Sequence, residues 1–113
     1  MNIDIKINEQ DEKHVEAFIR GEIDAYTAPK LKENLEKYQE EKDFELRVDL
    51  ADVGYMDSTG LGVFVGMYKC LRANNSELIL VGLPERLYRL FEITGLSDII
   101  EIKKEGEANG NNV

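Results

Sequence analysis

The sequence has very few of the residues on which most enzyme and metal sites depend. Its 113 residues include one cysteine, one histidine and no tryptophan. A single cysteine excludes an internal disulfide, and one histidine with one cysteine cannot complete a zinc shell. We therefore expect no metal and no cofactor, and we expect Cys70 to be a small packed thiol in a cytoplasmic protein.

Long apolar runs and basic clusters are also missing. The N-terminal residues alternate between apolar and polar, so they do not resemble a signal peptide, and no apolar run is long enough to cross a bilayer. Acidic residues number 23 against 14 basic ones, for a formal net charge of -9. Because such an excess repels phosphate backbones and anionic lipids, the sequence predicts direct contact with neither nucleic acid nor membrane.

Hydrophobic periodicity predicts the first half of the fold. Two alternating runs, 3–7 and 15–19, are separated by a polar stretch and indicate a pair of antiparallel strands. A helix is expected to follow, because Thr27 supplies a capping hydroxyl and Pro29 an early proline ahead of a leucine stripe. A third strand is expected over 46–50, followed by a short loop.

The second half repeats a strand and helix alternation. A helix is expected over about 58–72 with an apolar stripe, a buried and therefore central strand over 78–81, and a helix from Pro84 that ends at Gly95. The isoleucines at 99–102 suggest a short last strand. The order predicts one α/β domain over 1–102, a mixed β-sheet with packed α-helices, and a flexible polar tail over 103–113.

The most distinctive stretch is the turn from Asp57 to Gly62, at the carboxyl end of the third strand. Asp57 and Ser58 are both good N-cap residues for the helix that follows. The unpaired N–H groups and the dipole at that helix start favour a negative group. The Ser58 hydroxyl is therefore placed to act either as a nucleophile or as an acceptor of phosphate.

Three chemistries can be weighed against these residues. A serine hydrolase needs Gly-x-Ser-x-Gly and a histidine base, but Met56 occupies the first glycine position and nothing places His14 near Ser58. The glycines at 60, 62 and 66 fall inside the helical pattern, unlike those of a dinucleotide fingerprint. Aspartates at 49, 52 and 57 lack the acidic partner pair that a magnesium-binding receiver domain requires. A small serine-nucleophile or nucleotide-binding enzyme using this loop remains the alternative.

Phosphorylation of Ser58 explains the pattern better. A phosphate would add about -1.5 to -2 charges beside Asp57 and near Asp24. The N-terminus of the helix could accommodate the phosphate without unfolding of the domain. The change would instead be felt by a bound partner, because like-charge contact costs several kcal/mol across an interface.

Several segments resemble one known family, the STAS-domain anti-sigma-factor antagonists. The match covers nearly the whole chain and is greatest to antagonists of the general-stress (sigma-B) system. Position 54 departs from it, since many relatives carry serine where this chain has glycine. The matching segments are Gly21–Asp24, Ala28–Pro29, Val53–Gly66 and Arg86–Leu96.

The resemblance implies a partner-switching role that is not enzymatic. In that family the unphosphorylated antagonist binds an anti-sigma factor that is also a serine kinase, which releases the sigma factor for stress transcription. The kinase then inactivates the antagonist on the serine that matches Ser58, and a metal-dependent phosphatase of the PP2C type reverses this step. The resemblance assigns partner binding to Asp24, Asp57, Ser58, Thr59 and Gly60.

Overall fold

The computed structural model describes residues 2–104 and 106. Five strands and three α-helices form in the predicted order, with two short 3-10 helices between them. The strands are β1 Ile3–Glu9, β2 His14–Ile23, β3 Glu45–Met56, β4 Glu77–Leu83 and β5 Glu101–Lys104. The helices are α1 Ala28–Leu35, η1 Glu36–Glu40, α2 Ser58–Ala73, α3 Glu85–Ile93 and η2 Leu96–Asp98.

The strands form one mixed sheet in the order β1-β2-β3-β4-β5. β1 and β2 pair antiparallel, as the alternating runs predict, and all later neighbours pair parallel. β3 is the middle strand, and the strand predicted over 78–81 as a buried, central one is β4, which has a neighbour on each side. β4 is an interior strand, because β5 pairs along its far side, and this explains its continuous apolar run.

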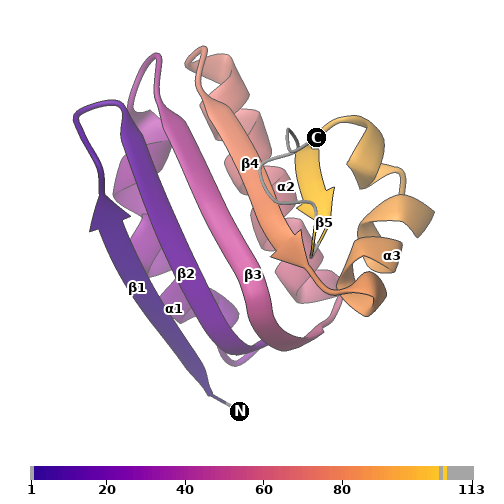
Figure 1. The fold of residues 1–113 in the computed structure, drawn as a ribbon. Coiled ribbons are helices and arrows are strands. Elements are labelled where there is room, and N and C mark those ends of the chain that lie inside the picture. The colour runs from indigo at the N-terminus through magenta and orange to yellow at the C-terminus, as the bar shows by residue number, and fades with distance from the viewer. Residues whose placement is uncertain (1, 105, 107–113) are drawn as a thin grey trace.

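Helices α1 and α2 cover one face of this sheet, and α3 lies toward its β5 edge (Figure 1). The core fills the space between them with fully buried side chains such as Leu31, Leu50 and Leu80. Phe64 of α2 meets Phe91 of α3 edge to face, with ring centroids 6.3 Å apart. An apolar stripe on each helix therefore packs onto the sheet, as the helical periodicity predicts.

The apolar pattern of α2 predicts a buried stripe of Leu61, Phe64, Val65, Tyr68 and Leu71, and the phase of the helix in the structure is different. Its buried residues are Gly60, Phe64, Met67 and Leu71, so the stripe is turned slightly from the one predicted. Cys70 lies off this stripe and is exposed, which corrects the expectation of a packed thiol.

The ends of two strands also differ from the predicted ones. β3 continues to Met56 where a short loop was expected after residue 50, and β5 continues to Lys104, two residues past the predicted end of the domain. The rest of the predicted tail, apart from Gly106, lies outside the described residues. Within the described part, no helix has the length and apolar character needed to span a membrane.

Candidate functional site

Ser58 is the first residue of α2 and is exposed. Only Asp57 separates it from the end of β3, so the side chain stands at a rigid strand-to-helix junction. The Asp57 carboxylate accepts from the backbone N–H of Thr59 at 3.0 Å and from that of Gly60 at 3.1 Å. Asp57 is thus the N-cap, and the Ser58 hydroxyl is left for other chemistry.

Gly60 fixes how closely this junction approaches the sheet. A Cβ at position 60 would lie 2.7 Å from Cγ of Met56, 2.8 Å from Cγ2 of Ile23 and 2.9 Å from the carbonyl oxygen of Ile23. The adjacent Asp57 N–H donates to that same carbonyl at 3.3 Å. Gly60 is therefore buried, and it serves the site by allowing the start of α2 to pack against β2.

Asp24 occupies the turn between β2 and α1 and is only 5% exposed. Its Oδ1 accepts from the backbone N–H of Tyr26 at 2.9 Å and from that of Thr27 at 3.1 Å. The Thr27 hydroxyl donates to the Glu22 carbonyl at 2.8 Å and accepts from the Asp24 N–H at 2.9 Å. Thr27 therefore closes this turn and makes no side-chain cap for α1, which corrects its predicted role.

The turn between β2 and α1 and the junction between β3 and α2 meet in a shallow hollow near Ser58. Its lining includes the carboxylates that sequence analysis paired, Asp24 and Asp57, together with aromatic side chains that it did not single out. Tyr26 is 84% exposed and Tyr55 is 50% exposed. Large exposed aromatic residues are typical anchors of protein interfaces. Their only signal in the sequence is their position next to the motif residues.

A groove between α1 and α2 begins at the same junction. Thr59 lies at one end, and Gly62, Gly66 and Cys70 follow along the exposed side of α2. A Cβ at Gly62 or Gly66 would meet nothing within 4 Å. Close approach of another segment of this chain therefore explains Gly60 but not the other two helical glycines.

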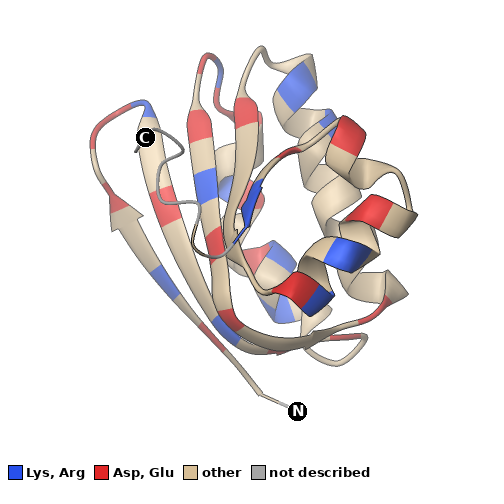
Figure 2. Ribbon diagram, turned by 45° about the vertical axis from the view of Figure 1, so that its right-hand side comes forward, with Lys and Arg blue, Asp and Glu red and all other residues tan. Residues whose placement is uncertain are grey.

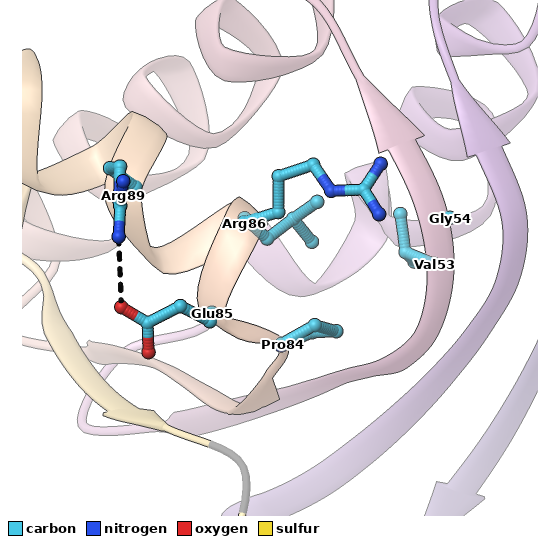
Figure 3. Close-up of a pocket in the computed structure, with 7 residues that line it drawn as sticks. Val53, Gly54, Pro84, Glu85, Arg86 and Arg89 are labelled. Atoms are coloured by element: carbon cyan, nitrogen blue, oxygen red, sulfur yellow. Dashed lines mark ion pairs between the residues drawn. The ribbon is translucent and has the colours of Figure 1, made fainter.

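A second hollow lies between the end of β3 and the start of α3 (Figure 3). Its walls include Val53, Pro84 and Leu87, and the Arg86 side chain extends across it toward Gly54. A Cβ at Gly54 would meet nothing within 4 Å. The structure therefore has room for a serine side chain at position 54.

The structure places His14, the one histidine of the sequence, far from Ser58. β2 and β3 run parallel, with His14 paired to Glu45 at one end and Ile23 paired to Met56 at the other. At about 3.3 Å per residue this places His14 roughly 30 Å from the serine end of the sheet. Within residues 2–104 and 106, no group of three His, Cys, Asp or Glu side chains is arranged to hold a metal.

The shifted pKa values lie at the far end of the sheet. A 2.9 Å contact between His14 Nδ1 and Asp11 Oδ1 raises the pKa of His14 and lowers the pKa of Asp11. Burial, with a 2.7 Å bond to Glu9, raises the pKa of Tyr38 to about 12. These pairs stabilise the β1–β2 hairpin end and are remote from Ser58.

Acidic residues are spread over much of the surface, with fewer basic ones between them (Figure 2). Acidic residues also predominate close to Ser58, because the hollow beside it is lined by Glu22, Asp24 and Asp57 and by no basic side chain. A phosphate on Ser58 would therefore add charge to an acidic surface.

Comparison with solved structures identifies the fold. An anti-sigma factor antagonist from Mycobacterium paratuberculosis superposes with a TM-score of 0.79 at 24% identity, over 90% of this chain and 86% of that one. The unphosphorylated anti-sigma factor antagonist SpoIIAA superposes with a TM-score of 0.73 at 15% identity, over 95% and 94%. At these identities the similarity concerns the fold.

Sequence comparison narrows the assignment. The chain is 66% identical to the anti-sigma-B factor antagonist of Listeria monocytogenes over 99% of both chains. It is 50% identical to that of Bacillus subtilis over 95% of this chain and 94% of that one. The model of the STAS domain matches residues 4–108. The chain therefore belongs to the STAS-domain family, among its anti-sigma-factor antagonists.

Proposed function

We propose that this protein is an anti-sigma-factor antagonist of the sigma-B type, controlled by phosphorylation of Ser58. In its unphosphorylated form it binds an anti-sigma factor that is also a serine kinase, and the sigma factor is released for stress transcription. A phosphatase of the PP2C type restores the binding form. The protein acts in the cytoplasm, by binding rather than by catalysis.

The observation that carries this proposal is the position of Ser58. Its side chain is exposed at the first position of a capped helix, where a kinase can reach it. The cap is provided by Asp57, so esterification of the serine oxygen breaks none of the bonds that hold the helix start. The fold thus remains intact while the charge of the surface changes.

The surface around Ser58 supports binding of a protein partner. Tyr26 and Tyr55 supply apolar area, and the neighbouring Asp24 and Asp57 supply negative charge. A partner that packs closely on the unmodified surface excludes water from Ser58 and has no group matched to a phosphate there, which would also be repelled by Asp24 and Asp57. Two further negative charges would then face a dehydrated contact, and a cost of about 3 kcal/mol lowers affinity more than a hundredfold.

The test combines the protein with its cognate kinase and ATP. We expect mass spectrometry to find one added phosphate, on Ser58, and the complex to dissociate as it accumulates. Ser58→Ala should bind the kinase with or without ATP. Thr59→Ala is the control for the identity of the acceptor, because Thr59 is a second exposed hydroxyl one residue further along, and this variant should still gain one phosphate.

Two results would contradict the proposal. If Ser58→Ala were released by ATP as readily as wild type, the switch would lie elsewhere. If the isolated protein hydrolysed esters or bound nucleotide, with loss of this activity in Ser58→Ala, the serine-nucleophile alternative would hold instead.

A further inference from the structure

The outer edge of β1 is a free edge of the sheet. Among residues 2–104 and 106, β1 is first in the strand order and has β2 as its one neighbouring strand. From Asp4 onward its side chains are exposed or half-buried, and Ile7 is 36% exposed. A free edge presents unpaired N–H and C=O groups that another strand can use.

The outward groups can be assigned from the hydrogen bonds. The Glu22 N–H donates to the Asn2 carbonyl, so Asn2 directs its backbone toward β2. In an antiparallel pair this orientation alternates along the strand, and the backbone groups of Ile3, Ile5 and Ile7 therefore point away from the sheet. Lys30 Nζ donates to the Ile3 carbonyl at 3.1 Å, which agrees with this assignment, and a second strand would share this carbonyl with Lys30 or displace it.

We propose that this edge pairs with β1 of a second copy of the chain, antiparallel and centred on Ile5. In that register Ile5 faces Ile5, and Ile3 faces Ile7 of the second copy, so residues with outward backbone groups meet each other. Asp4 faces Lys6 of the second copy, and Lys6 faces Asp4. The contact is self-complementary, as a two-fold interface must be.

Other registers do not match. A one-residue shift places outward groups against groups already bonded to β2, so no ladder forms. A two-fold axis at Lys6 would set Lys6 against Lys6, and one at Asp4 would set Asp4 against Asp4, so both place like charges together. An axis at Ile7 would set Ile5 against Glu9, and one at Ile3 would leave only the first few residues paired. Lysine on an edge strand usually discourages pairing, but in the Ile5-centred register Asp4 neutralises it.

The occupant is a second copy because charge complementarity is built into β1 itself. Opposite charges directly across two strands stabilise the pair, and like charges destabilise it. A seven-residue edge buries little area, and each copy carries a net charge of -9. The association is consequently weak and reversible. It goes beyond the proposed function and does not involve Ser58.

Hydrogen exchange on the wild-type protein tests the register directly. In dilute solution the N–H groups of Ile5 and Ile7 should exchange quickly, while those of Asp4 and Lys6 are protected by β2. In concentrated solution Ile5 and Ile7 should gain protection, and sedimentation equilibrium should show mass rising from 12.9 kDa toward twice that value. A monomer at every concentration, or unchanged exchange at Ile5 and Ile7, overturns the proposal.

Charge variants test which residues meet. Lys6→Asp should abolish association, because Asp4 would face an aspartate, and adding Asp4→Lys to it should restore association with the charges exchanged. Lys42→Asp, at an exposed position away from β1, makes the same change in net charge and should leave association near the wild-type level. Equal loss in both single variants, or no restoration in the double variant, overturns the register. Phosphorylation of Ser58 should proceed at the wild-type rate in all of them.

Discussion

Gly60 of α2 lies so close to Ile23 of β2 that a Cβ at position 60 would come within 2.8 Å of Cγ2 of Ile23 and 2.9 Å of its carbonyl oxygen. This contact joins the turn before α1 to the start of α2, and it therefore sets the distance between Asp24 and Ser58. The geometry of the proposed switch depends on the absence of a side chain.

We expect Gly60→Ala to lower the free energy of unfolding by about 1–3 kcal/mol, because the methyl group must displace backbone as well as side chains. Gly62→Ala is the matched control, since nothing lies within 4 Å of its Cβ position. It should raise stability by about 0.5–1 kcal/mol through helix propensity. Urea denaturation measures both, and equal effects would contradict the packing account.

Asp24 should prove to be a structural residue as well as a neighbour of the site. Asp24→Ala removes the acceptor of two backbone N–H groups in a buried turn, and we expect a loss of about 1–3 kcal/mol in unfolding free energy. Asp24→Asn keeps an acceptor oxygen at the same place, so its unfolding free energy should fall by less. Partner binding compared between the two variants at a temperature where both are folded separates recognition from folding. Unchanged stability in Asp24→Ala would contradict this role.

Sequence periodicity predicted the order and type of every α-helix and strand, because apolar spacing reports which face of an element is buried. It also placed Ser58 at a helix start. It missed the continuation of β3 to Met56, since Asp52 and Gly54 are typical of loops. Pairing with β2 along Arg20–Ile23 extends that strand, and such pairing cannot be inferred from local sequence.

The side-chain environment was harder to predict than the elements. The burial of Asp24 depends on the four-residue turn between Ile23 and Ala28, and a polar residue in a turn normally suggests exposure. Cys70 is exposed because it lies off the buried stripe of α2, whereas its residue type alone suggests burial. Tyr26 and Tyr55 share a hollow only because the turns after β2 and β3 meet at the same end of the sheet.

Ser58→Asp should separate stability from binding. A carboxylate at the first position of α2 interacts favourably with the helix dipole, so we expect the unfolding free energy to stay within about 1 kcal/mol of wild type. Affinity for the kinase should fall by about a hundredfold, as for the phosphorylated form. Isothermal titration calorimetry and thermal unfolding measure the two quantities. Ser58→Asn is the uncharged control and should retain most of the affinity.

Tyr26 offers a test of the binding surface at the hollow. Because it is 84% exposed, Tyr26→Ala should leave thermal stability nearly unchanged. We expect Tyr26 to anchor the partner, so the variant should lose about 2 kcal/mol or more of binding free energy. Ile93→Ala, at a residue 75% exposed on α3, is the control for loss of exposed apolar area. Equal affinity in both variants would place the partner elsewhere.

The His14–Asp11 pair predicts a pH dependence at the end of the sheet opposite Ser58. Its contact with Asp11 raises the pKa of His14 in the folded state. The stabilisation from His14 is therefore fully present below its unfolded pKa of about 6.5, and it is lost as pH rises through the folded pKa.

The stabilisation from Asp11 depends on pH in the opposite direction. Because its folded pKa is lowered, its stabilisation is present above the unfolded value of about 3.9 and is lost as pH falls through the folded pKa. The pair should therefore contribute most on the acidic side of neutrality, and salt should weaken it because both side chains are exposed. An NMR titration of His14 should show its pKa falling toward 6.5 in Asp11→Asn. An unchanged titration would mean that the contact does not persist in solution, whereas partner binding at Ser58 should be the same in both proteins.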